Sequence, residues 1–75
     1  MTVFVLQVQA PKELPTVLSV YTSHEKAIDA GEAWLKDVLD MYGYDVEEHE
    51  DAMDAVDRHM MDDLYYDVIQ IDEVL

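Results

Sequence analysis

The sequence is poor in four residue types: it has no cysteine, two glycines, two prolines and only four basic residues among 75. Without cysteine there is neither a disulfide framework nor a thiolate metal site, which suits the cytoplasm. Four scattered cations cannot grip a phosphate backbone or an anionic membrane, because both interactions depend on clustered Lys and Arg. No apolar run approaches the roughly 18 residues of a membrane span, and the N-terminus lacks the basic segment of a secretion signal. We therefore expect a cytoplasmic protein that neither binds nucleic acid directly nor enters a membrane.

Acidic residues are what the chain has in excess, with 18 Asp and Glu and a net charge of −14. A small soluble domain needs a net charge of magnitude roughly 2 to 8. The hydrophobic content of 51% is that of a globular chain, so residues 1–75 are predicted to form a single domain with a thin core. The charge is uneven: residues 1–44 carry −3 and residues 45–75 carry −11. Such a field favours a partner with a basic surface.

Three segments have the β-branched and aromatic composition of strands. In residues 2–9, side chains expected on the more buried face of a strand alternate with those on its other face. Residues 16–21 follow after a polar loop bounded by Pro11 and Pro15. We expect these two strands to pair antiparallel. Residues 64–71 return to the same composition and are predicted to be the third strand.

The longest helical pattern begins near Ser23. Thr22 and Glu25 have the spacing of a reciprocal capping box, and from there apolar residues including Trp34 fill one continuous half of the helical wheel. Gly31 lies within that half, where a missing side chain permits close approach to a sheet, and Gly43 is placed to end the helix. This segment is predicted to be the core helix.

Residues 47–63 are predicted to form a second, acidic amphipathic helix. Its apolar positions Ala52, Met53, Val56 and Met60, together with Leu64 directly after it, fall within an arc of about 120° at 100° per residue. The whole chain is therefore predicted to be α+β, an antiparallel three-stranded sheet with a core helix and a second acidic amphipathic helix, in the order β-β-α-α-β.

The acidic side of this helix is the predicted partner-binding site. Along a helix that rises about 1.5 Å per residue, its carboxylates approach the charge density of duplex DNA, about one phosphate charge per 1.7 Å. The predicted contacts are Glu47, Glu48, Glu50, Asp51, Asp54, Asp57, Asp62 and Asp63. Possible flanking contacts come from Tyr44, Met61 and Tyr65, and Met61 is predicted to lie on the acidic side, away from the core.

Metal binding and catalysis are the two alternatives to simple binding. His49 and His59 lie among carboxylates, yet they form no His-Glu-x-x-His pattern, so both are interpreted as solvated, and no metal or cofactor is predicted. A catalytic carboxylate pair needs a concave site, for which a thin core leaves little room. The chain also has neither a glycine-rich phosphate loop nor a cysteine nucleophile, so no catalytic residue is predicted.

The helix start from Thr22 to Ala27, Thr-Ser-His-Glu-Lys-Ala, and the hairpin, helix and strand layout resemble small phage and bacterial domains. In size and in its acidic second half the chain is similar to phage-encoded DNA mimics, the anti-CRISPR and anti-restriction proteins. This resemblance implies that the chain inhibits a host defence complex, by occupying the DNA-recognising surface of a Cascade-like or restriction complex in the host cytoplasm.

A different class of function stays open beside the decoy hypothesis. The chain could be a small structural or regulatory interaction module that assembles through the third strand or Met61, with its charge serving solubility. Either a monomer or a homodimer is compatible with the sequence.

Overall fold

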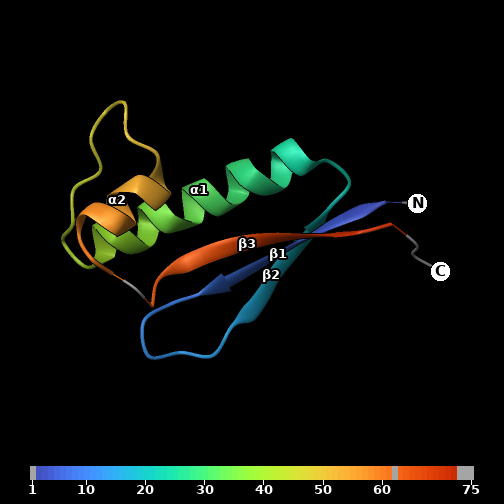
Figure 1. Ribbon diagram of the computed structural model, residues 1–75, viewed down its shortest axis with the longest axis horizontal. Helices are drawn as coiled ribbons and strands as arrows, with labels where there is room; N and C mark the ends of the chain where they lie inside the picture. The colour runs from blue at the N-terminus through green and yellow to red at the C-terminus, as the bar shows by residue number, and fades with distance from the viewer. Residues whose placement is uncertain (1, 62, 73–75) are drawn as a thin grey trace.

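A computed structural model describes residues 2–61 and 63–72 and shows a three-stranded sheet with two helices on one side (Figure 1). The α+β class and the order β-β-α-α-β are confirmed. The elements are β1 (Val3–Gln9), β2 (Thr16–Tyr21), α1 (His24–Met41), α2 (Ala52–Arg58) and β3 (Tyr65–Ile71).

The sheet is antiparallel, with strand order β2-β1-β3, so the first strand of the chain is the central one. Side chains alternate between its two faces. Leu6 and Val8 of β1 point toward the helices and are buried, and their β3 partners in the register are Val68 and Tyr66. A bulge interrupts the pairing with β2 after Leu6.

Helix α1 begins and ends by recognisable capping. Ser23 is the N-cap, and its hydroxyl accepts a hydrogen bond from the Lys26 amide, so the cap lies one residue after the predicted Thr22. At the other end Gly43 adopts a φ of 80° and donates to the Asp40 carbonyl, while Tyr44 donates to the Leu39 carbonyl. This pair of bonds is a Schellman motif, and it confirms that Gly43 ends the helix.

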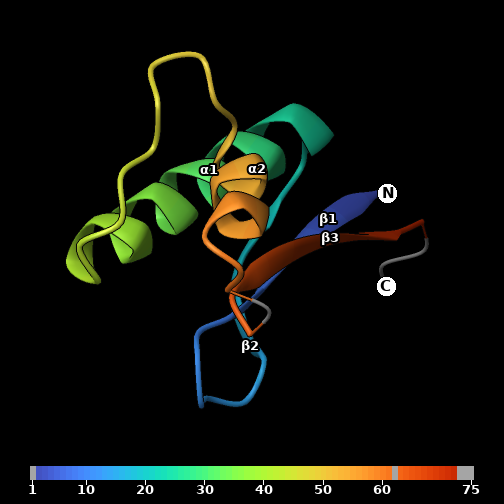
Figure 2. The same ribbon diagram turned by 60° about the vertical axis from the view of Figure 1, so that its left-hand side comes forward.

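The core lies between α1, α2 and the inner face of the sheet (Figure 2). Leu35 and Leu39 of α1 are fully buried beside Leu64, and Trp34 packs against this cluster as predicted. Gly31 allows the ring of Tyr66 to lie directly on the α1 backbone, because a Cβ at that position would come within 2.7 Å of the ring. The predicted close approach of helix and sheet at this glycine is confirmed.

The second helix is much shorter than predicted. It covers residues 52–58 rather than 47–63, and residues 45–51 form a loop that we call the acidic loop. The helix ends in a second Schellman motif, in which Met60 donates to the Asp57 carbonyl and Met61 to the Val56 carbonyl. Met60 takes the left-handed conformation, with a φ of 58°, that glycine takes in α1.

This early end changes where the methionines lie. Met53 packs against the core as predicted, but Met60 is 82% exposed, so its predicted place in the core is wrong. Met61 is half-buried against the core instead of lying among the acids, because the chain has already left the helix. No helix in the described part of the chain is long and apolar enough to cross a membrane.

Candidate functional site

Most of the predicted carboxylates are exposed, but they are carried by a loop and a short helix instead of one long helix. The exposed ones, together with Asp45, which was not among the predicted contacts, form what we call the acidic surface; its members are Asp45, Glu47, Glu48, Asp51, Asp54, Asp57 and Asp63. Glu50 is excluded because its side chain is only 13% exposed, and Asp62 lies outside the described residues. The acidic loop and α2 both lie on the helical side of the sheet (Figures 1 and 2).

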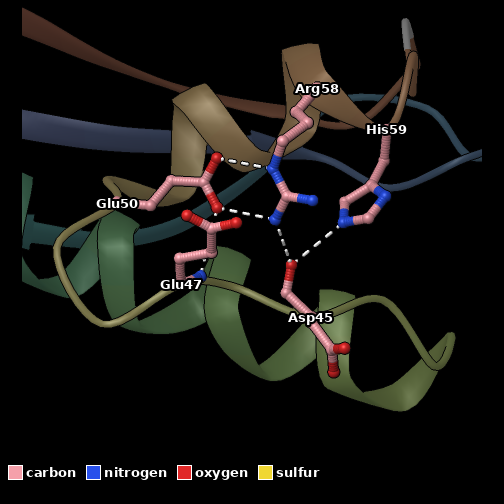
Figure 3. Close-up of polar contacts among 5 residues, drawn as sticks. All are labelled: Asp45, Glu47, Glu50, Arg58 and His59. Carbon is pink, nitrogen blue, oxygen red and sulfur yellow. Dashed lines mark hydrogen bonds and ion pairs between the residues drawn. The ribbon is translucent and has the colours of Figure 1, made fainter.

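Glu50 is engaged by Arg58, the only cation in residues 45–75 (Figure 3). Arg58 Nε donates to Glu50 Oε2 at 2.8 Å and Nη2 donates to Oε1 at 2.7 Å, which is a bidentate ion pair. The hydrogen bonds from Arg58, followed by the bond from the Glu47 amide, lower the pKa of Glu50 from 4.5 to about 2. Glu50 is therefore a structural carboxylate that is already paired within the protein.

The backbone carbonyl of Asp45 is the second anchor of the loop. It accepts from Arg58 Nη2 at 2.8 Å and from His59 Nε2 at 2.9 Å. Because a carbonyl can only accept, His59 carries its proton on Nε2, and its ring also lies 4.7 Å from that of Tyr44 between centroids. His59 is thus a loop anchor and not a solvated residue as predicted, whereas His49 is exposed.

A turn within the loop replaces the predicted first turns of the helix. The Glu50 amide donates to the Glu47 carbonyl at 3.0 Å, and the Glu47 amide donates to Glu50 Oε1 at 3.1 Å. Glu50 therefore closes the turn with both its backbone and its side chain. The acidic loop is a folded segment, held at Asp45 and at Glu50 by the same arginine.

Helix α2 is capped by a carboxylate from α1. Asp51 occupies the N-cap position without a side-chain cap, and Glu32 Oε2 instead accepts from the Ala52 amide at 2.7 Å. Glu32 Oε1 accepts from the Tyr66 hydroxyl at 2.9 Å, so one carboxylate joins α1, α2 and β3. Burial, followed by the bond to Glu32, raises the pKa of Tyr66 from 10.0 to about 12.

Sequence reasoning missed both of these roles. By its position in the sequence Glu32 belongs to the polar half of the first helical wheel, and no local signal indicates a partner 20 residues away. For Arg58 a signal exists, because a lone cation among many carboxylates is expected to pair with one of them. Which one it would choose depends on the loop, since Glu50 lies eight residues before it.

A hollow of ≈ 400 Å³ lies between the end of α1 and the acidic loop. Its lining is mostly acidic and consists of Lys36, Asp40, Tyr44, Asp45, Val46, Glu47 and Glu48. Carboxylates around a concave site attract a cation, and the planar guanidinium of arginine makes the best geometric match to them. The hollow is therefore suited to a basic side chain of a partner.

The possible flanking contacts lie apart from one another. Tyr44 is 38% exposed and lines the hollow, so it stands beside the acidic loop. Tyr65 pairs with Gln9 on the sheet face that points away from the helices, because its neighbour Tyr66 points toward them. Met61 packs against the core. Of the three, Tyr44 adjoins the acidic loop.

Within residues 2–61 and 63–72, no group of three or more His, Asp or Glu side chains is arranged to hold a metal ion. Comparisons of the chain with protein-family models, with curated proteins and with solved structures find no match. The function is therefore argued from the chemistry of the acidic surface.

Proposed function

We propose that the protein is an acidic decoy that imitates DNA and binds a basic nucleic-acid-binding surface of a host defence complex, of the CRISPR-Cas or restriction type. By occupying that surface it blocks DNA binding. Such a decoy would act in the cytoplasm of the host, without a cofactor and without catalysis.

The observation that carries this proposal is that the acidic loop is folded. Arg58 ties it down at two points, and Glu32 fixes the start of α2 beside it. A protein that needed charge only for solubility could leave those carboxylates on a flexible tail. In a fixed arrangement the carboxylates are already ordered before the basic partner binds. Little conformational entropy is then lost on binding, which favours the complex.

The spacing of the charges supports imitation of a phosphate backbone. Asp51, Asp54 and Asp57 follow one another at three-residue intervals from the N-cap along α2. With a rise of about 1.5 Å per residue, successive members lie about 4.5 Å apart along the helix axis. Phosphates along one DNA strand are spaced about 3.4 Å apart along the duplex axis.

A charge-reversal experiment tests the proposal. Asp51, Asp54 and Asp57 are changed together to Lys, and displacement of labelled DNA from a purified Cascade-like complex and a restriction enzyme is measured. The matched control is the same triple change at Glu13, Asp29 and Asp37, which are exposed, lie outside the hollow and alter the net charge equally. We expect wild type and control to displace DNA and the α2 variant to fail, while circular dichroism stays unchanged.

Arg58→Gln separates fixed shape from charge alone. The substitution makes the protein more negative by one charge, so simple attraction to a basic surface predicts tighter binding. If the fixed loop matters, binding weakens, because the ion pair with Glu50 is lost and the Asp45 carbonyl keeps only its bond from His59. Tighter binding by this variant, or no DNA displacement by wild type from either class of complex, would contradict the decoy proposal.

One observation favours a second candidate function, a structural or regulatory interaction module whose charge serves solubility. The sheet face opposite the helices exposes apolar side chains, including Val20 and Ile69. Binding through that face depends on apolar contact, so it persists at high salt, whereas decoy binding weakens as salt screens the charges. Salt dependence of partner binding therefore distinguishes the two candidates.

A further inference from the structure

The sheet has an open face that neither helix covers (Figures 1 and 2). Residues that pair directly across antiparallel strands share a face, so the register identifies its members. Val5 of β1 is opposite Val20 of β2 and Ile69 of β3, which makes an apolar row across all three strands. Val3 and Ile71 form the beginning of a second row beside it. We call this side of the sheet the open face.

The exposure of these side chains is high for their type. Val20 is 54% exposed, Ile69 41% and Ile71 40%, and Val17 on the same face is 58% exposed. An antiparallel sheet that faces water normally shows polar residues on that side. Large contiguous apolar patches are rare on monomeric proteins and mark interaction sites.

The distribution of charge indicates which partner covers the open face. The three paired strands carry one carboxylate on it, Asp67 at the edge in β3, although the chain as a whole has a net charge of −14. A basic partner would be drawn to the acidic surface on the helical side, away from this face. A mostly apolar face with a single carboxylate is matched by another of the same kind, and a second copy of the chain supplies one.

We propose that the open face is the interface of a homodimer, in which two sheets pack face to face about a two-fold axis. In this arrangement Val5, Val20 and Ile69 of one copy meet the same row of the other. The four layers are helices, sheet, sheet and helices. The two acidic surfaces point outward at opposite ends, where their mutual repulsion is smallest.

The size of the open face sets the expected strength. Three strands about 4.8 Å apart, each about seven residues long at 3.3 Å per residue, cover roughly 14 by 23 Å. Two such faces have a flat area of about 640 Å² together. Because the projecting side chains make the accessible surface larger than the flat area, they bury on the order of 1,000 Å² of it, at the low end of specific interfaces. We therefore expect a reversible dimer with a dissociation constant in the micromolar range, and not an obligate one.

Salt gives this interface a signature opposite to that of decoy binding. Two molecules with the same large charge repel one another, and salt screens that repulsion without weakening apolar contact. The dimer should tighten as salt rises. This behaviour does not depend on the decoy proposal, and the α2 charge-reversal variant should dimerise at least as well as wild type.

Sedimentation velocity over a concentration series, at low and high salt, tests the interface. Val20→Lys and Ile69→Lys each place a charge on the open face, and Met41→Lys is the matched control at a 76% exposed site at the end of α1. We expect the dissociation constant to rise at least about tenfold, which corresponds to about 1.4 kcal/mol, in the first two variants and to stay close to wild type in the control. Circular dichroism verifies that each variant is folded.

A second measurement needs no variant. In NMR spectra of wild-type protein labelled at Val and Ile methyl groups, dilution should shift the methyl signals of the open face and leave those of the core unchanged. The proposal is overturned if wild type is a monomer at millimolar concentration and high salt. It is also overturned if the dimer survives Val20→Lys and Ile69→Lys, or if Met41→Lys weakens it equally.

Discussion

Glu32→Ala removes the carboxylate that joins α1 to α2 and β3. The Ala52 amide, in a fully buried residue, loses its acceptor, and the Tyr66 hydroxyl loses its partner. Hydrogen bonds to charged groups contribute about 1.5–3 kcal/mol each, and a buried amide left unpaired costs about 1–3 kcal/mol. Both bonds are only partly buried, so water replaces part of each when Glu32 is removed, and alanine also gains a few tenths of a kcal/mol of helix propensity. We therefore expect a net loss of about 2–3 kcal/mol. For a 75-residue protein with roughly 4–11 kcal/mol of stability in total, that is a large fraction.

Urea unfolding measures this loss. With a slope of about 1 kcal/mol per molar urea, the midpoint should fall by about 2–3 M. Asp37→Ala is the matched control, because it removes an exposed acid from the same helix and changes the net charge equally. Tyr66→Phe removes one of the two bonds and keeps the ring on Gly31, so its expected cost is about 1 kcal/mol. Surface substitutions usually change the free energy of unfolding by no more than roughly 0.5 kcal/mol. If the free energy of unfolding of Glu32→Ala differs from that of the Asp37→Ala control by no more than this amount, the Glu32 carboxylate has no structural role.

Three further outcomes are expected. Met60→Gly should stabilise the protein by about 0.5–1 kcal/mol in the same assay, because the left-handed conformation costs about 1–2 kcal/mol for a residue with a Cβ; Met60→Ala keeps the Cβ and should show no such gain. In an absorbance titration, one of the five tyrosines should ionise near pH 12, and this ionisation step should be absent in Tyr66→Phe. Because the pKa of Tyr66 is raised in the folded protein, the stability that its hydroxyl contributes should be present below pH 10 and lost between pH 10 and 12. Because the pKa of Glu50 is lowered from 4.5 to about 2, the stability that its ion pair contributes is present above pH 4.5 and lost as the pH falls to about 2. The difference in stability between wild type and Glu50→Gln should therefore shrink over that pH range. A difference independent of pH would contradict the ion pair.

Local patterns predicted the strands and the first helix well. Alternation in residues 2–9 and the apolar half around Trp34 are signals that lie within each element itself. Gly43 could be assigned in advance because only the left-handed conformation at that point explains a glycine after an apolar run. The strands, the first helix and its end are each determined by residues close together in the sequence, and such local patterns can be recognised in a single sequence.

The second helix was overestimated because its apolar pattern continued past its true end. Leu64 is buried, as the helical arc required, but it reaches the core from the turn that leads into β3, where its amide donates to the Met61 carbonyl. Met60 occupies a conformation that is uncommon for a residue with a side chain, so nothing in the sequence indicated a stop there. The carboxylates before Ala52 suited a helix N-terminus equally well, although the turn closed by Glu50 is what forms.

The open face shows a different limit. Alternation predicted that one side of the first strand would be more buried, yet both sides of that strand carry apolar residues such as Val5 and Leu6. Which strand lies in the centre, and hence that Val20 and Ile69 flank Val5, depends on the pairing order β2-β1-β3. The order of strands depends on contacts between residues far apart in the sequence, so no local pattern in a single sequence predicts it.

The acidic half of the chain, residues 45–75, carries strong self-repulsion, and its helix α2 has only seven residues. A helix that short is not stable by itself. Its order comes from the packing of Ala52, Ala55 and Val56 in the core. Bonds that span the chain add to this, among them Glu32 to Ala52 over 20 residues, Arg58 to the Asp45 carbonyl over 13 and Arg58 to Glu50 over eight. Two of the three use the only cation of that half, which could otherwise have lowered its charge at any surface position. Placing it where it fixes the loop, while the seven carboxylates of the acidic surface remain exposed, is what a function based on the shape of a negative surface requires.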